Sequence, residues 1–426
     1  MSRQFLSELT ILLSILLCLA TPISAAQPSS DSDPLAQSGR GRELLLRGEY
    51  EKGLEQLDRA YRLFPLNPTF KRTLAEGYAA YGQHLLKLKR YEQADETFSK
   101  AVELYPDDPA YAGLRGIGSY YLKKYDVARY ELERSRQQQP GSIDVLFYLG
   151  MVLYETDNRP QAVELWEQGL TLSSGRKEFR EMLEKARREM AVENGMDRGH
   201  SSRFDLTYDP GVNTTFALAV LDVLEAAASR VGAELGHFPQ ARVPVAIYKR
   251  DDYKAVTASP DWSGGVYDGT IRLPFGAFQE VTPQMRGVLF HEYAHVVVFD
   301  LARGTCPLWL NEGIAEMFGR AQYSPAAMKP GQGAGRVVPA DFRKLEGSFS
   351  GLSTAEASLA YQQSYSLVNY IVTTYGWHRI SEMLTALGNG AGIDEAVNGT
   401  FRDYGLSYDG LVREWQESME RSVAGK

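Results

Sequence analysis

The chain has 426 residues, with 46 Lys and Arg against 54 Asp and Glu, and a formal charge of −8. This length allows two or three domains, each with a hydrophobic core of its own. The acidic balance, without any long basic stretch, gives no support for nucleic-acid binding.

Residues 1–26 have the pattern of a secretory signal peptide. Arg3 precedes an apolar stretch from Ile11 to Leu19, and small residues follow before the expected cleavage point. We therefore expect an exported protein, secreted or, in a bacterium, periplasmic. The apolar stretch is too short for a comfortable membrane span, so no transmembrane domain is expected after cleavage. The alternative is an uncleaved anchor, because Glu8 is unusual in such a leading region.

Residues 40–193, which follow a polar linker predicted at residues 27–39, contain a repeated pattern. Small residues recur at intervals of 41, 34 and 34 positions, at Gly53, Ala94, Ala128 and Ala162. Prolines close the first three units at the same intervals, at Pro65, Pro106 and Pro140. Glycines recur with the period of 34 in the first helix of three units, where they predict close helix packing, at Gly82, Gly116 and Gly150.

This pattern resembles the tetratricopeptide repeat, which has a period of 34 residues. The resemblance implies helical hairpins that stack into an α-helical solenoid with a concave surface. A protein partner is expected on that surface. The alternative is that the repeats only space or stabilise the rest of the chain, because periodicity predicts a fold and does not identify a ligand.

Residues 194–203 are polar and rich in turn formers, so they predict a linker before a second domain at residues 204–426. That domain begins with mixed α and β patterns. We expect a strand at 203–208, a helix at 215–235, a strand at 243–248 and a hairpin at 264–274 with Asp268 and Gly269 at its turn.

The helix predicted next carries a His-Glu-x-x-His motif at residues 291–295. At about 100° per helical residue, His291 and His295 lie only about 40° apart, and Glu292 lies at the rim of the same face. Two imidazoles in this arrangement can bind one Zn²⁺ while the carboxylate reaches a water molecule. A catalytic zinc needs a third protein ligand, for which Glu312 on the following predicted helix is the candidate.

Two neighbours of Glu312 are candidates for supporting roles. Glu316 lies one helical turn further on the same face and can accept the outer N–H of a ligating histidine. Asn311 can orient the other histidine in the same way. Cys306, just before this helix, is read as a packing residue.

At these two helices the chain resembles the gluzincin zinc metallopeptidases, the thermolysin and aminopeptidase type, and more narrowly their peptidase MA-like relatives. The resemblance covers roughly the last 220 residues and implies one Zn²⁺ per chain on His291, His295 and Glu312, with Glu292 as the general base. The whole chain is thus expected to be a tetratricopeptide solenoid followed by an α+β zincin-type metallopeptidase domain.

The resemblance also places an edge strand over the active-site cleft, at the predicted hairpin. An extended peptide or protein substrate could pair with this edge through main-chain hydrogen bonds, so Val266, Tyr267 and Ile271 are candidate substrate-binding residues. The alternative is an ordinary edge strand blunted by Pro274. The chain lacks the Gly-x-Met-Glu-Asn segment of the aminopeptidases in this group, which favours an endopeptidase.

In the gluzincins a tyrosine on a later helix donates its hydroxyl to the oxyanion, and residues 360–371 resemble that helix. Tyr361 is the expected donor, with Tyr365 and His378 as alternatives, unless the tyrosines only pack in the core. A glycine- and proline-rich loop near the cleft is expected at residues 323–341, and covering helices are expected at 380–387, 394–400 and 408–421.

These residues predict an exported zinc-dependent peptidase in which Glu292 takes a proton from the attacking water. The repeats would recruit substrate or a partner. The alternative is a catalytically inert interaction scaffold with a peptidase-like domain, although a degenerate site usually loses its ligands or its base first.

Overall fold

The computed structural model describes residues 33–156, 158–257, 265–275, 277–323, 342–347, 349 and 353–424. The predicted signal peptide and most of the predicted loop at 323–341 lie outside these residues. The chain divides into two compact units, with the boundary between Arg187 and Arg188. Among the described residues, no helix has both the length and the apolar composition that crossing a membrane requires.

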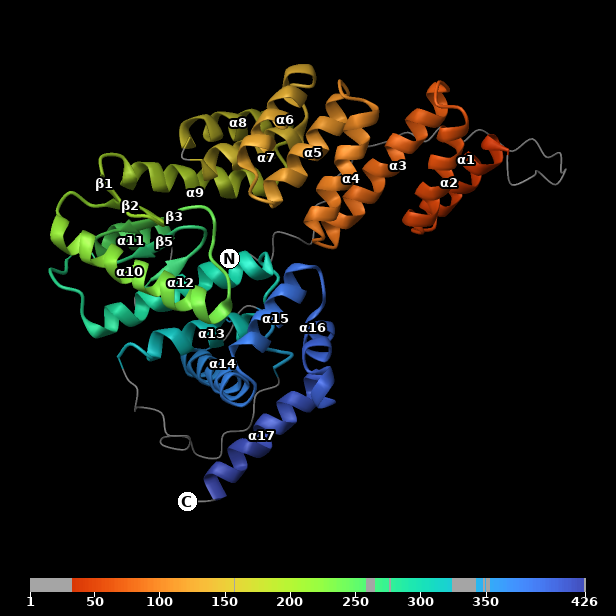
Figure 1. Cartoon of the computed structure of the whole chain (residues 1–426). Coiled ribbons are helices and arrows are strands. Elements are labelled where there is room, and N and C mark those ends of the chain that lie inside the picture. Colours follow the sequence, from red (N-terminus) through yellow and green to blue (C-terminus); the bar gives the residue numbers. More distant parts are fainter. Residues whose placement is uncertain are drawn as a thin grey trace. The chain divides into compact units, whose positions relative to one another are not determined.

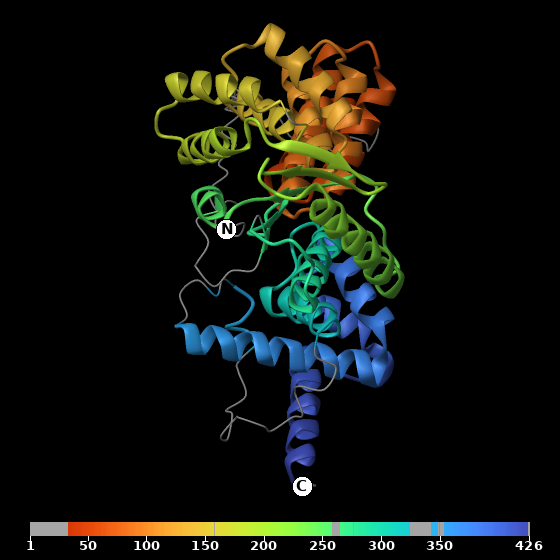
Figure 2. The same ribbon diagram turned by 90° about the vertical axis from the view of Figure 1, so that its left-hand side faces the viewer.

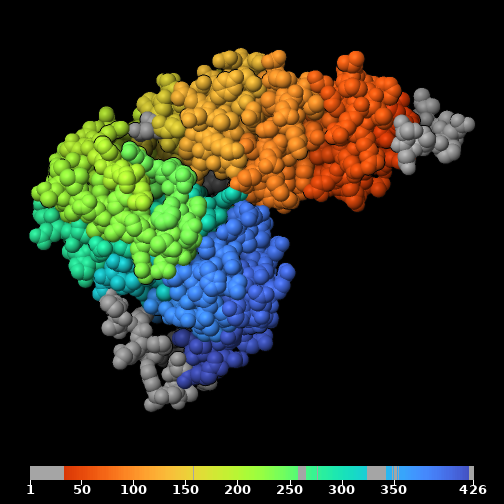
Figure 3. Space-filling model, viewed as in Figure 1, coloured from red at the N-terminus to blue at the C-terminus, as the bar shows by residue number. Residues whose placement is uncertain are grey.

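The first unit is a row of helical hairpins followed by a single helix (Figure 1). Its helices are α1 (Pro34–Leu46), α2 (Tyr50–Leu63), α3 (Pro68–Lys87), α4 (Tyr91–Leu104), α5 (Pro109–Tyr121), α6 (Tyr125–Gln138), α7 (Ile143–Glu155), α8 (Arg159–Leu172) and the first part of α9 (Lys177–Glu193), whose last residues, from Arg188, belong to the second unit. In the space-filling view, successive hairpins pack side by side into a continuous layer (Figure 3). The predicted helical repeat fold is therefore confirmed.

Local sequence explains where the hairpins begin and turn. The side chains of Asp33, Asn67 and Asp108 cap α1, α3 and α5, and a proline follows each cap at the first helical position. The cap at Asp33 starts α1 at Pro34, so the prediction of a linker through residue 39 is wrong for its last residues. The turns inside the hairpins use a left-handed residue, which is Gly48 in the first and Lys89 in the second.

The recurring glycines mark the closest contact inside each hairpin. A Cβ on Gly82 would lie 2.4 Å from the Phe98 ring, and one on Gly150 would lie 2.2 Å from Nε1 of Trp166. Gly116 faces Leu132 at 2.6 Å in the same way. Because no side chain fits there, a large residue of the second helix fills the space, as the glycine period predicts.

The second unit combines a small sheet with helices. Its elements are β1 (Asp197–His200), β2 (Phe204–Tyr208), α10 (Thr214–Leu235), β3 (Val243–Ile247), α11 (Arg250–Thr257), β4 (Val266–Tyr267), β5 (Ile271–Leu273), α12 (Pro283–Ala302), α13 (Leu308–Arg320), α14 (Thr354–Tyr375), α15 (Trp377–Gly388), α16 (Ile393–Thr400), the 3₁₀ helix η1 (Arg402–Tyr404) and α17 (Tyr408–Ala424). These elements confirm the predicted α+β class and the strands and helices expected in this region.

The strand order of the sheet is β1-β2-β3-β5-β4. The β2–β3 and β3–β5 pairs are parallel, and the outer strands β1 and β4 run antiparallel to their neighbours. β1 lies within residues 194–203, which we predicted to be a linker. That prediction is wrong for residues 197–200, because they pair with β2 in a regular register from Asp197–Tyr208 to His200–Asp205.

One face of the sheet packs on the main hydrophobic core, which includes residues of α10, α12, α13, α14 and α15. In Figure 2 the long helix α14 lies crosswise beneath α12 and α13, and α17 runs away from it. Tyr253 of α11 and Val192 at the end of α9 belong to a smaller apolar cluster with Tyr248, just after β3. The unit thus places α12 and α13 at the centre of a packed core.

Candidate metal centre

Helix α12 carries both histidines of the motif. It starts with Thr282 as its cap, whose hydroxyl accepts a hydrogen bond from the Met285 amide, and Pro283 is the first helical residue. Its apolar side chains, Leu289 and Phe290 among them, are buried in the core. The helix is therefore held on several sides, and this fixes the direction in which its histidines point.

The two imidazoles and one carboxylate converge on a single point. Nε2 of His291 and Nε2 of His295 are 3.1 Å apart. Oε2 of Glu312, on α13, lies 3.6 Å from each of these nitrogens. Within the described residues, His291, His295 and Glu312 form the group of side chains that could hold a metal ion.

Close helix contacts at glycines bring these side chains together. A Cβ on Gly319 of α13 would lie 3.0 Å from the Gly287 carbonyl oxygen and 3.2 Å from Cβ of His291. A Cβ on Gly313, next to Glu312, would lie 2.5 Å from the Ser364 carbonyl oxygen of α14. α13 therefore approaches both neighbouring helices more closely than side chains would allow.

The donor set fits a zinc ion. Tetrahedral zinc with bonds of about 2.0–2.2 Å separates its ligand atoms by about 3.3–3.6 Å. The two nitrogen–oxygen distances of 3.6 Å lie in this range, and the nitrogen–nitrogen distance of 3.1 Å is slightly shorter. Among the described residues, Oε2 of Glu312 is buried without a hydrogen-bond partner. A buried carboxylate oxygen in that condition costs free energy unless a cation or a donor meets it.

The predicted supporting residues lie on the outer side of the histidines. Oδ1 of Asn311 is 2.9 Å from Nδ1 of His295. Oε1 of Glu316 is 3.6 Å from Nδ1 of His291, a longer separation typical of an ion pair. In this arrangement each histidine has a polar partner behind it and its Nε2 atom directed toward the shared point.

The electrostatics of the zinc-free cluster follow from burial and proximity. Burial by itself would lower the pKa of His291, but the Glu312 carboxylate, followed by Glu292 and Glu316, raises it to about 9. For Glu312, burial would raise the pKa, and the nearby histidines outweigh it and hold the pKa below its usual value. The cluster therefore favours a positive charge beside Glu312.

Glu292 lies at the same face and is 5% exposed. Burial raises the pKa of Glu292, although the two histidines oppose this shift. Its carboxylate lies against the start of β4, because a Cβ on Gly265 would be 3.0 Å from Oε1 of Glu292. A carboxylate with a raised pKa next to a strand edge is suited to receive a proton from water.

The three candidate oxyanion donors occupy different places. Tyr361 is half-buried, and its pKa is raised by burial first and then by the site's carboxylates, with Glu312 contributing most. Arg320 lies 4.3 Å from the centre of the Tyr365 ring. His378 is exposed and follows the far end of α14, about 21 Å from Tyr361 at 1.5 Å per helical residue. Of the three candidates, Tyr361 is thus the one whose pKa the carboxylates of the site are seen to raise.

The predicted substrate residues are divided by the strand pairing. Val266 and Tyr267 form β4, the outer strand, and both are half-buried. Ile271 is fully buried in β5, which pairs with β3 on one side and with β4 on the other. The expectation that Ile271 contacts substrate is therefore wrong, because neither its side chain nor its main chain is available.

Sequence reasoning missed two residues beside the site. The Nε atom of Arg320 donates to Oε2 of Glu316, and the spacing of four residues between an acid and a base on one helix was a usable signal. No sequence pattern marks Gly265, because its contact with Glu292 arises only when the start of β4 packs against α12.

Residues 224–421 match the family model of the Peptidase MA superfamily, and residues 75–108 match the tetratricopeptide repeat model. Comparison with curated proteins gives no match. Among solved structures, "Crystal structure of MamA protein" is 16% identical over 36% of this chain and 80% of that chain, with a TM-score of 0.31. "First TPR of Spaghetti (RPAP3) bound to HSP90 peptide SRMEEVD" is 20% identical over 28% and 93%, with a TM-score of 0.27. The chain thus carries a tetratricopeptide repeat and a domain that matches the Peptidase MA superfamily.

Proposed function

We propose that this chain is an exported zinc-dependent peptidase that hydrolyses peptide bonds of protein or peptide substrates, most simply as an endopeptidase. The observation that carries the proposal is the convergence of His291, His295 and Glu312 within 3.6 Å of one another, beside the buried carboxylate of Glu292. Export depends on the signal predicted at residues 1–26 and is part of the proposal.

His291, His295 and Glu312 would hold one Zn²⁺, with Asn311 and Glu316 orienting the histidines. When bound, the ion would polarise a carbonyl oxygen and lower the pKa of water toward about 7. Three protein ligands leave a fourth position open, which is the arrangement of catalytic rather than structural zinc sites.

Glu292 is the proposed general base. Its carboxylate would accept a proton from the attacking water and return that proton to the departing amide nitrogen, so one side chain serves both halves of the reaction. The raised pKa supports this role, because burial makes the carboxylate a stronger base than an exposed glutamate and so helps it to accept the proton.

Tyr361 is the proposed hydrogen-bond donor to the developing oxyanion. Its raised pKa keeps the hydroxyl protonated at neutral pH, so that it can donate. The packing of its ring against Phe349, with ring centres 5.5 Å apart, limits its side-chain motion.

The outer strand β4 is the proposed docking edge for an extended substrate. Its partner β5 occupies one side of the strand, and the other side has no neighbour among the described strands. Because Gly265 at its start touches Glu292, a chain paired with β4 would pass directly beside the base.

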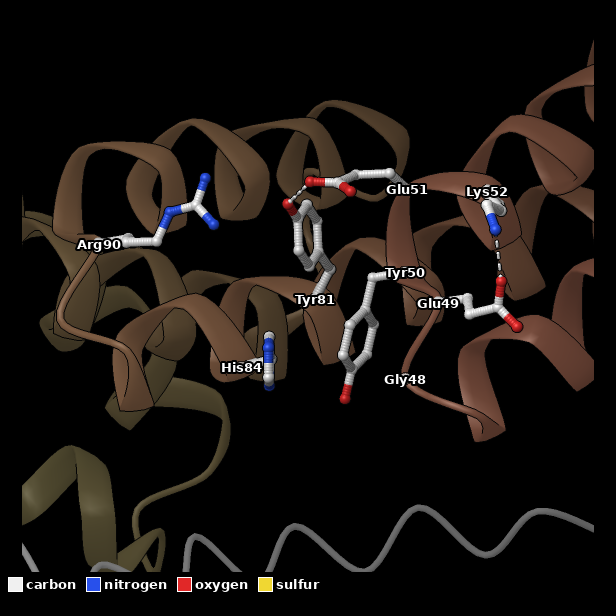
Figure 4. Close-up of a pocket in the computed structure, with 8 residues that line it drawn as sticks. All are labelled: Gly48, Glu49, Tyr50, Glu51, Lys52, Tyr81, His84 and Arg90. Carbon is white, nitrogen blue, oxygen red and sulfur yellow. Dashed lines mark hydrogen bonds and ion pairs between the residues drawn. The ribbon is translucent and has the colours of Figure 1, made fainter. Parts of the chain in front are cut away.

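The repeats are proposed to bind a protein partner or to recruit substrate. One surface cleft, of about 280 Å³, lies between α2 and α3 (Figure 4). The Tyr50 ring stacks there with two rings of α3, and its centre lies 5.3 Å from that of Tyr81 and 4.6 Å from that of His84. Arg90 and Lys52 also line this cleft, so it offers aromatic and charged groups to a polar peptide.

The test is a Glu292→Gln variant compared with the wild-type chain. We expect both proteins to bind one zinc, and only the wild type to cleave casein in a chelator-sensitive reaction, because the amide cannot accept the proton. Retained turnover in the variant would remove Glu292 from its role. Zinc binding without any wild-type proteolysis would favour the inert scaffold.

A further inference from the structure

A buried arginine lies on the face of the sheet opposite the main core. Arg272 is the middle residue of β5 and is 1% exposed, whereas its neighbours Ile271 and Leu273 point into the main core. A buried guanidinium is costly unless charged and polar groups surround it. The groups that surround the Arg272 side chain therefore indicate its structural role.

Arg272 contacts three carboxylates and a hydroxyl. Its Nη2 atom lies 2.7 Å from Oε1 of Glu189 and its Nη1 atom lies 3.0 Å from Oε1 of Glu193, both on α9. Nη1 also donates to the Tyr248 hydroxyl at 2.5 Å. Nε donates to Oδ1 of Asp268, in the turn between β4 and β5, at 3.1 Å.

Both glutamates belong to the C-terminal unit, which begins at Arg188, inside α9. Glu189 is fully buried and Glu193 is 8% exposed in its side chain. Low exposure removes the screening that weakens surface ion pairs. The end of α9 is thus bonded to the middle residue of β5 through buried charges.

Arg272 is also the direct partner of the proposed docking strand. In the β4–β5 register it lies opposite Val266. Gly265, the residue before Val266, touches the Glu292 carboxylate. The Arg272 guanidinium therefore joins α9 to the hairpin turn. The strand residue opposite Arg272 is next to Gly265, which contacts the proposed base Glu292.

We propose that Arg272 is a positioning residue that holds the β4–β5 hairpin, through Glu189, Glu193 and Asp268, in the place where β4 receives substrate. This inference rests on the proposed peptidase function for its effect on catalysis. The planar fork of arginine reaches all of these partners at once, and lysine, with a single charged nitrogen, cannot reproduce that geometry.

The mildest test is Asp268→Asn in the full chain, because Asp268 is 33% exposed in its side chain and its loss leaves the buried pairs to α9 intact. Arg272→Lys is the stronger variant. The control is Asp205→Asn, which removes a surface ion pair with Arg242 on the same sheet. Zinc content and circular dichroism establish that each protein is folded.

Two measurements are made on each protein, and the first is KM and kcat for a peptide substrate. We expect KM to rise roughly threefold to tenfold in both hairpin variants with little change in kcat, because substrate docking is lost before chemistry. The second is hydrogen–deuterium exchange of residues 265–273, which should accelerate roughly tenfold as the hairpin opens more often. The control should match the wild type in both measurements.

Unchanged KM and unchanged exchange in folded Asp268→Asn and Arg272→Lys proteins would overturn the proposal, as would a fall in kcat alone. If Arg272→Lys does not fold, the Asp268→Asn protein decides. If the wild type shows no proteolysis, the peptidase function fails, and the exchange measurement still decides whether Arg272 holds the hairpin.

Discussion

Gly313 offers a sensitive test of the proposed metal centre, because it lies next to Glu312 where α13 meets α14. In Gly313→Ala the new Cβ would lie 2.5 Å from both the Ser364 carbonyl oxygen and Cγ2 of Val368. Normal contacts at these atoms are about 3.4–4 Å, so the helices must separate by a large fraction of an ångström. Zinc ligands tolerate displacements of only about 0.2 Å.

Overpacking of this kind costs about 1–3 kcal/mol. For a unit of about 150–250 residues this corresponds to a fall in the melting temperature of about 2–12 °C. Zinc affinity should fall as well, because the displaced helix carries Glu312. Calorimetry gives the melting temperature, and competition with a chromogenic chelator gives the zinc affinity.

Gly399→Ala is the matched control, because Gly399 lies in α16 with no atom within 4 Å of its added Cβ. There alanine should be neutral or stabilise the helix by up to about 1 kcal/mol. If the Gly313→Ala protein has the melting temperature and the zinc affinity of the wild type, the inference that the close helix contact positions Glu312 is refuted.

Further predictions concern the same site. Tyr361→Phe should lower kcat about 100-fold, the worth of one oxyanion donor of about 3 kcal/mol, and equal losses in Tyr365→Phe would contradict the assignment. Asn311→Ala should weaken zinc binding about 10- to 100-fold in chelator competition. Because the zinc-free pKa of His291 is raised to about 9, zinc must displace a proton at neutral pH. Zinc affinity measured by titration should therefore rise with pH and level off near pH 9. In the zinc-free protein, the charge on His291 stabilises the fold fully below about pH 6.5, and this stabilisation is lost as pH rises through about 9.

The periodic features of the sequence predicted much of the fold. The small-residue period located the hairpins because each unit repeats the same packing, as Gly82 against Phe98 illustrates. The linker boundaries were less predictable. Polar residues at 197–200 form β1 because β2 supplies a partner, and local composition does not reveal a distant partner.

The candidate site was predictable where one helix carries the residues. Helical spacing alone puts His291 and His295 on one face, and the spacing along the next helix does the same for Glu312 and Glu316. The roles of Ile271 and Arg272 were not predictable. Whether each side chain is buried depends on the order of the strands and on the packing of α9 against the sheet. The sequence of a three-residue strand with one arginine predicts that the arginine side is exposed, whereas both faces are buried.

The outer strands of the sheet also bear on self-association. Unpaired strands invite other copies of the chain to add to them, and proteins limit this with charge or brevity. β1 carries Asp197 and Arg198, both exposed, and β4 is two residues long. A strand this brief offers another copy of the chain too few main-chain bonds to nucleate a fibril, so the strand that we propose as the docking edge carries little risk of aggregation.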